Sequence, residues 1–250
     1  MIPTPIQTVL STFQKHGVRA LLMGGQACVF YGAAQISKDV DFVLPEDGEN
    51  FARMLRALDE LQAGRIAVPP FDPAILARGH AVHFRCQHPA AQGVRVDVMT
   101  RLRDLATFEI LWERRNVFGE PSGETFDLLS VPDLVRAKMT QRDKDWPVIR
   151  LLVEIHYSER RAEPTPFRVE FWLREMRSPK LLIEVADANR DRAETLRPER
   201  PLLVHALSGN EEALAEALSA EERLLRQRDR EYWLPLRAEI EGFRRAEHKS

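Results

Sequence analysis

Hydrophobic positions in the first part of the chain change repeatedly between helical and extended spacing. Apolar residues every three or four positions predict amphipathic helices over residues 4–17, 26–31 and 50–61. Short apolar or alternating runs predict buried strands over residues 18–23, 39–44, 81–86 and 94–99. A turn-rich piece separates the last two strands and indicates a hairpin. Helices interleaved with strands in this way are typical of a mixed α/β (α+β) domain.

The later part of the chain has a different pattern, with helical spacing and no convincing strand beyond Ser130. Ser130 and Asp133 form a capping pattern that predicts a helix start. The proline-containing stretch 163–166 is the best candidate linker, and further helix starts are predicted near Pro166, Pro179, Glu211, Ala220 and Tyr232. Ser219 begins a capping pattern that predicts the start near Ala220. We therefore expect an α/β domain over residues 1–115, a helical extension over 116–162 and an all-helical region over 163–250.

Composition and charge narrow the class of protein. Of the 250 residues, 44% are apolar and 30% are charged, as in ordinary soluble globular proteins. The formal net charge of −2 excludes a global positive field, so a nucleic-acid substrate would need a local basic patch. No apolar run approaches the ~20 residues of a membrane helix. The opening residues lack a secretion signal, and Cys28 and Cys86 lie in apolar segments. We therefore expect no membrane partner, a cytoplasmic location and reduced thiols, with one disulfide as the alternative.

Two aspartates on one predicted strand carry the strongest chemical signal. Asp39 and Asp41 are two residues apart, so both project from one face of the strand with backbones ~7 Å apart. Like charges at this spacing repel unless a cation neutralises them, and a hard divalent ion accepts carboxylate oxygens. Asp97 lies on a later strand between two core-facing valines, on the same side as Arg95. The three aspartates are candidate metal ligands, and a solvated strand edge is the competing interpretation.

Gly24 and Gly25 follow a predicted strand and open the next predicted helix. Two residues without side chains let a phosphate approach backbone N–H groups at the positive end of that helix. A plain tight turn explains the pair equally well when it is taken alone. The order of the features favours the phosphate hypothesis, because the glycines come just before the acidic strand.

The segment from Gly24 to Phe42 resembles the nucleotidyltransferase superfamily that includes DNA polymerase beta. In that superfamily a strand, a Gly-Gly or Gly-Ser turn and a helix precede Asp-x-Asp on the next strand, and a third acid follows on a later strand. The nearer resemblance is to bacterial abortive-infection nucleotidyltransferase toxins and their relatives, which often carry Gly-Gly-x-Ala before Asp-x-Asp. It covers roughly the first 150 residues and implies a small mixed sheet flanked by helices, with the catalytic domain over residues 1–115.

The resemblance also implies a reaction, a cofactor and a set of site residues. A nucleoside monophosphate would pass from a nucleoside triphosphate to an acceptor, with Mg²⁺ or Mn²⁺ as cofactor. The implied catalytic residues and metal ligands are Asp39, Asp41 and Asp97. A second block, which begins at Ser130, is similar to the same group and implies that a lysine and a later aspartate complete the nucleotide site. The implied nucleotide-binding residues are Gly24, Gly25, Ser37, Lys138 and Asp145.

One departure from the family pattern leaves a second function open. Gln35 stands where relatives frequently carry arginine, and Ser37 stands where they carry threonine. The alternative is a catalytically inactive nucleotidyltransferase fold that acts as a binding protein or an antitoxin-like regulator. If the protein is an active nucleotidyltransferase, the acceptor of the nucleotide is RNA, a protein side chain or a small molecule. Only the resemblance to the toxins points to transfer RNA and to a toxin–antitoxin partner protein.

Several candidate residues also have ordinary explanations. Asp145 precedes Trp146-Pro147 and is a natural helix cap, and Lys138 suits an ion pair one turn away on a helix. A zinc site is disfavoured, because odd spacing on an extended strand sends side chains to opposite faces; its members would be His80, His83, Cys86 and His88. Arg150 and His156 resemble the arginine–histidine pair of helical ribonucleases. They are six positions apart on a helix, however, so their side chains point in different directions.

Overall fold

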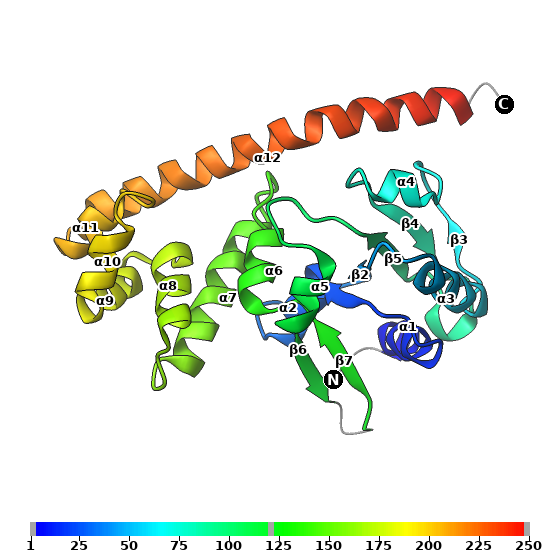
Figure 1. Ribbon diagram of the computed structural model, residues 1–250, viewed down its shortest axis with the longest axis horizontal. Helices are drawn as coiled ribbons and strands as arrows, with labels where there is room; N and C mark the ends of the chain where they lie inside the picture. The colour runs from blue at the N-terminus through cyan, green and yellow to red at the C-terminus, as the bar shows by residue number, and fades with distance from the viewer. Residues whose placement is uncertain (1–3, 120–122, 248–250) are drawn as a thin grey trace. The chain divides into compact units, whose positions relative to one another are not determined.

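The computed structural model describes residues 4–119 and 123–247 (Figure 1). Contacts divide the chain into two units. The first, here called the sheet unit, comprises Met1–Phe30, Ala34–Ala137 and Trp233–Ser250. The second, here called the helical unit, comprises Tyr31–Ala33 and Lys138–Tyr232. The α/β class that the sequence predicts is confirmed. The described ranges contain no helix with the length and apolarity that a bilayer crossing requires.

In the sheet unit, the described residues form a seven-stranded sheet in the order β3-β4-β5-β2-β1-β7-β6. Strand β2 runs parallel to β5 and β1 runs parallel to β7, whereas the other neighbours are antiparallel. The predicted hairpin is confirmed as β4 and β5. The strands are β1 (Leu21–Met23), β2 (Asp39–Val43), β3 (Gly64–Arg65), β4 (Val82–Arg85), β5 (Arg95–Met99), β6 (Asn116–Gly119) and β7 (Thr125–Leu128).

One face of the central strands is packed as a hydrophobic core. Alternation along β2 buries Val40 and Phe42, and Phe42 stacks on Phe13 of α1 with ring centroids 4.6 Å apart. Capping sets where helices begin: the Ser130 hydroxyl donates to Asp133 and accepts from its backbone N–H at the start of α6. The helical elements of this unit are α1 (Thr4–Lys15), α2 (Gly24–Phe30), α3 (Gly48–Glu60), α4 (Pro73–Leu76), η1 (Pro89–Ala91), α5 (Phe108–Glu113) and α6 (Val131–Ala137).

The sheet extends further along the chain than the sequence indicates. We expected a helical extension from residue 116, but β6 and β7 occupy the described part of 116–128 and pair with each other as a hairpin. Strand β7 continues the sheet, because Leu128 pairs with Leu22 of β1. These strands have four residues each, too few to show a clear period of two. The pairing of β7 with β1 is a long-range contact.

The helical unit contains packed short helices and most of one long helix. The indole rings of Trp146 and Trp172 are buried there. We expected separate helices to start near Ala220 and Tyr232, but α12 is continuous over 37 residues and includes Pro235. The supposed cap, Ser219, instead donates its hydroxyl to the carbonyl of Ala215 one turn earlier. The helices are α7 (Asp145–Arg160), α8 (Pro166–Glu175), α9 (Pro179–Ala188), α10 (Arg190–Leu196), α11 (Leu203–Leu207) and α12 (Glu211–Glu247).

Candidate active site on the sheet

Two rows of polar side chains cross the sheet on the face opposite the core. Strand register sets both rows, because residues paired on neighbouring strands project from the same face about 4.8 Å apart. The first row is Asp41 of β2, Asp97 of β5 and His83 of β4, and the second is Asp39, Arg95 and Arg85 on the same strands. The three predicted aspartates are therefore brought together on adjacent strands. The register also adds His83 and Arg85, which the sequence interpretation did not include.

Asp97 is the most enclosed of the three carboxylates, with 9% of its surface exposed. Arg95 binds both of its oxygens: Nε lies 2.7 Å from Oδ1 and Nη2 lies 2.8 Å from Oδ2. His83 Nδ1 lies 2.8 Å from the same Oδ1. Burial raises the pKa of Asp97, but the hydrogen bonds and charges of His83 and Arg95 outweigh burial, so its pKa lies below the ordinary value. Asp97 is therefore an anion at neutral pH.

One ring nitrogen of His83 faces two different partners. Its Nδ1 lies within hydrogen-bond distance of Asp97 and also 3.0 Å from Arg95 Nη2. A carboxylate only accepts and a guanidinium only donates, so Nδ1 cannot serve both in one protonation state. The anionic Asp97 favours Nδ1–H as donor.

Arg95 lies in the combined field of all three aspartates. The pKa of its guanidinium is raised first by the hydrogen bonds to Asp97, against the opposing effect of burial, and further by the charges of Asp97, Asp39 and Asp41. Asp39 is exposed and Asp41 is half-buried. The site therefore combines one enclosed, arginine-bound carboxylate with two more accessible carboxylates on the next strand.

The structure supplies a steric reason for both glycines of the Gly-Gly turn. Gly24 has φ +67°, and a Cβ placed on it would lie 2.0 Å from Oδ2 of Asp41. A Cβ on Gly25 would lie 2.8 Å from the hydroxyl oxygen of Ser37. Because of this overlap, any larger residue at position 24 must displace the Asp41 carboxylate. The left-handed backbone at this position also disfavours a side chain. The role of Gly24 and Gly25 in binding phosphate stays a prediction.

The loop before β2 is tied to the strand by Ser37. The Ser37 hydroxyl donates to the backbone carbonyl of Asp39 at 3.0 Å, and this contact holds the loop against the first residue of the acidic strand. Gln35 is exposed in the same loop. Ser37 is thus close to the acids in the structure, and its contact with nucleotide stays a prediction.

Lys138 and Asp145, the other predicted nucleotide residues, bind each other in the helical unit. Lys138 Nζ lies 3.2 Å from Asp145 Oδ1, and both side chains are buried. Thr140 donates its hydroxyl to Asp145 at 2.6 Å, and Arg142 Nε donates at 2.7 Å. Burial raises the pKa of Asp145, but the charge of Lys138, the Thr140 hydrogen bond and the Arg142 charge lower it below the ordinary value overall. These contacts fasten the first turn of α7, and a role with nucleotide stays a prediction.

The donor chemistry of the sheet site fits a divalent cation. Three carboxylates on one face of two neighbouring strands are the oxygen donors that Mg²⁺ and Mn²⁺ accept. In their present conformations, however, no three His, Cys, Asp or Glu side chains within residues 4–119 and 123–247 stand close enough to hold a metal ion. In this arrangement both oxygens of Asp97 are bound to Arg95.

The disfavoured zinc and ribonuclease sites are not assembled by the fold. His80 Nε2 contacts Glu239 at 2.9 Å, whereas His83 contacts Asp97. Cys86 is buried, and burial raises the pKa of its thiol to about 11. In the helical unit, His156 accepts from the Trp172 indole at 2.9 Å while Arg150 pairs with Glu154. Each side chain therefore has a separate structural setting.

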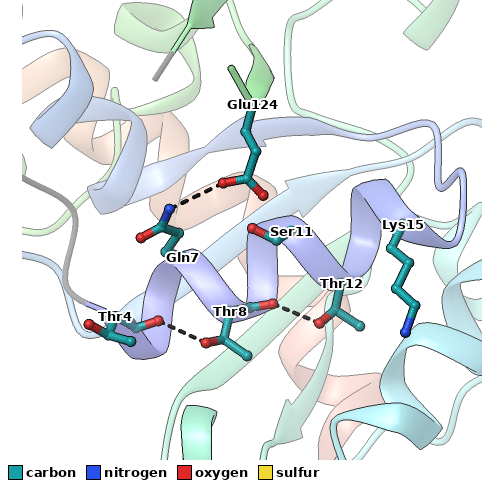
Figure 2. A pocket seen from close by; sticks show the side chains of 7 residues that line it. All are labelled: Thr4, Gln7, Thr8, Ser11, Thr12, Lys15 and Glu124. Atoms are coloured by element: carbon teal, nitrogen blue, oxygen red, sulfur yellow. Dashed lines mark hydrogen bonds between the residues drawn. The ribbon is translucent and has the colours of Figure 1, made fainter. Parts of the chain in front are cut away.

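A groove of about 510 Å³ on the outer face of α1 is separate from the predicted site (Figure 2). Its walls include hydroxyls that are occupied by their own helix, since Thr8 donates to the carbonyl of Thr4 and Thr12 donates to that of Thr8. Gln7 donates to Glu124 across it at 3.1 Å. The lining residues are Thr4, Gln7, Thr8, Ser11, Thr12, Lys15 and Glu124. The groove thus lacks the carboxylate cluster on which the chemical hypothesis depends.

Comparison of the chain with protein-family models and with curated proteins found no match. Sequence reasoning missed His83 as a neighbour of Asp97. Alternation with Val82 and Phe84 was a usable signal, since it turns His83 away from the core. The hairpin register that sets it beside Asp97 could not be read from that alternation alone.

Proposed function

We propose that the protein is a metal-dependent nucleotidyltransferase that moves a nucleoside monophosphate from a nucleoside triphosphate to an acceptor hydroxyl. The observation that carries the proposal is the register of β2 with β5, which sets Asp41 beside Asp97 and Asp39 one pleat away on the same face. An acid cluster with one exposed and one half-buried carboxylate beside the enclosed Asp97 is suited to cations and to the phosphates that accompany them. Mg²⁺ or Mn²⁺ is the proposed cofactor.

Each proposed residue has a defined task. Asp39 and Asp41 bind the cation, which when bound neutralises charge on the phosphate and the leaving pyrophosphate. Asp97 would also bind a cation, and it would orient the acceptor hydroxyl or take up its proton. The acceptor oxygen then forms a bond to the α-phosphorus while the bond to pyrophosphate breaks. Gly24 keeps room for the Asp41 carboxylate, since a Cβ there would overlap Oδ2.

A labelled-nucleotide assay tests this function. The protein is incubated with each α-labelled triphosphate, Mg²⁺ or Mn²⁺, and a panel of acceptors that includes transfer RNA, proteins and small hydroxyl compounds. We expect label transfer by the parent protein and none by the Asp39→Asn, Asp41→Asn double variant. Asp59→Asn, which changes an exposed aspartate on α3, is the matched control. Equal transfer by the parent and the double variant would contradict the proposed site.

The second candidate is a nucleotidyltransferase fold that binds nucleotide or a partner protein without turnover. The observation that favours it is the complete engagement of Asp97 by Arg95 and His83, together with Gln35 at the position where relatives frequently carry arginine. Tight nucleotide binding without transfer to any acceptor in the panel would support this candidate. Transfer that depends on Asp39 and Asp41 would exclude it. An antitoxin-like or toxin partner and a cytoplasmic location belong to the proposal as expectations.

A further inference from the structure

Arg95 occupies the carboxylate that the proposed cation needs. It is bonded to both oxygens of Asp97 through two different nitrogens, the bidentate geometry in which a guanidinium binds a carboxylate most specifically. Within the sheet register it also lies beside Asp39 in the second polar row. A single arginine therefore contacts one member of the acid cluster and faces the strand that carries the other two.

The side chain of Arg95 is held by contacts that can be exchanged. Its side chain is 36% exposed, so the guanidinium reaches solvent while it binds the enclosed Asp97. Arg95 and Asp97 are two residues apart on one strand, so the ion pair can open by rotation of the arginine side chain without a change in strand pairing. A cation that takes an Asp97 oxygen must replace at least one of the two hydrogen bonds.

We propose that Arg95 is the resident counter-ion of Asp97, which competes with a divalent cation for that carboxylate and so sets the affinity of the site for metal. The inference rests on the proposed function, because it takes the same acid cluster as the metal site. Arg95 keeps the enclosed Asp97 neutralised before the cation binds. It is a positioning residue, since it acts through Asp97.

Arg85 provides a matched comparison for the competition. It carries the same charge, projects from the same face and pairs with Arg95 in the register of β4 and β5. The hydrogen bonds to Asp97 come from Arg95 and His83 instead. Loss of Arg85 therefore changes the local charge without releasing Asp97, whereas loss of Arg95 changes the charge and releases the carboxylate.

Titration with Mn²⁺ alone, followed by the paramagnetic signal of the free ion, tests the inference without any measurement of activity. We expect Arg95→Gln to bind Mn²⁺ about tenfold more tightly than the parent protein. This factor is the lower end of the change in proton affinity that an arginine causes in an adjacent aspartate. Arg85→Gln should change the affinity by no more than about twofold, as for a charge screened by solvent. An equal gain in both variants would overturn the inference, because it would reflect general charge alone.

Thermal unfolding guards against a variant that folds poorly. Arg95→Gln leaves Asp97 without its bidentate partner, so the variant should melt below the parent in the absence of metal, and Mn²⁺ should raise its Tm by more than it raises that of the parent. Arg95→Lys keeps the charge but loses the bidentate fork, and its Mn²⁺ affinity should fall between those of the parent and Arg95→Gln. Parent-like affinity and melting in both variants would overturn the inference.

The proposed function and the inference fail in different ways. If the Asp39→Asn, Asp41→Asn variant loses Mn²⁺ binding while Arg95→Gln binds as the parent does, the metal site stands and the role of Arg95 is refuted. A triple variant adds Asp39→Asn and Asp41→Asn to Arg95→Gln. If it binds Mn²⁺ as tightly as Arg95→Gln alone, the ion does not use the acid cluster, and both the proposed metal site and the role of Arg95 are refuted. Tighter binding by Arg95→Gln that depends on Asp39 and Asp41 supports both.

Discussion

Asp97 in the sheet unit and Asp145 in the helical unit share their burial and an arginine partner, but they differ in the charges of the groups around them. Both are buried, both hydrogen-bond to an arginine, and both have a pKa below the ordinary value. The charges of Lys138 and Arg142 both act on Asp145. Around Arg95, by contrast, the charges of three aspartates act on one guanidinium. Positive charges therefore outnumber negative ones around Asp145, whereas negative charges outnumber positive ones around Arg95.

This difference shows that a depressed carboxylate pKa does not by itself mark a functional site. Asp145 has a lysine, an arginine and a threonine hydroxyl around it, and together these contacts secure the turn that begins α7. Asp97 lies in a row that continues to Asp41 on the next strand. We expect changes around Asp145 to register chiefly in stability and changes around Asp97 to register chiefly in chemistry.

The largest effect is expected for Asp39→Asn. The substitution removes one proposed cation-binding oxygen charge, so the rate of nucleotidyl transfer should fall about 10³-fold, as for other losses of electrostatic stabilisation in active sites. Asp39 is exposed, so the free energy of unfolding should change by no more than about 0.5 kcal/mol. Transfer kinetics and denaturant unfolding measure the two quantities. A large loss of stability with unchanged transfer would reverse the comparison.

Asp145→Ala should destabilise the protein by about 3 kcal/mol, because it leaves the buried Lys138 ammonium without its counter-ion. Denaturant unfolding measures the loss. Asp143→Ala is the matched control. Asp143 lies two residues before Asp145, and its exposed side chain pairs with Arg226. We expect this variant to lose less than about 1 kcal/mol. Equal losses in the two variants would show that burial does not distinguish them.

His156 should make the stability depend on pH between about 4 and 6.5. Burial, and then the charges of Arg160 and Arg168, lower its pKa from 6.5 to about 4. In this interval the unfolded chain binds a proton that the folded chain does not, so stability falls as pH falls, by at most about 3 kcal/mol. The lowered pKa values of Asp97 and Asp145 act separately, since the stability that they contribute is lost only below their ordinary pKa of 3.8.

The matching variant is His156→Gln, which should flatten the slope of unfolding free energy between these pH values. Arg160→Gln should reduce the slope by a smaller amount, because it removes only one of the charges that lower the pKa of His156. Denaturant unfolding at several pH values measures both slopes. A slope in His156→Gln equal to that of the parent would show that another group is responsible.

The smallest expected effect concerns the glycine beside the acids. Gly24→Ala should destabilise by about 2 kcal/mol, from its left-handed backbone and from overlap with Asp41. Gly17 has φ +66° with nothing within 4 Å of an added Cβ, so Gly17→Ala should cost about 1 kcal/mol from the backbone alone. Gly24→Ala should also reduce transfer, whereas Gly17→Ala should leave transfer unchanged. Identical behaviour of the two variants would remove the steric role of Gly24.

Local patterns predicted much of the fold, and the exceptions have identifiable causes. The apolar spacing of α1 and α3 and the alternation of β2 are visible within single segments, so these elements were predicted near their observed bounds. The capping pattern at Ser219 was misleading, because that hydroxyl bonds to the preceding turn within α12. Strands β6 and β7 were missed, since short strands are recognisable mainly by their partners.

By itself, the sequence determined which residues face together along each strand. The period of two sets Asp39 with Asp41 on β2, and Arg95 with Asp97 on β5, away from the buried valines. Only the tertiary structure decided that Asp97 lies beside Asp41 and His83, and that Arg95 binds both Asp97 oxygens. The physical reason is that register between strands depends on packing and turns far apart in the chain, and a shift of one residue would send each side chain to the other face.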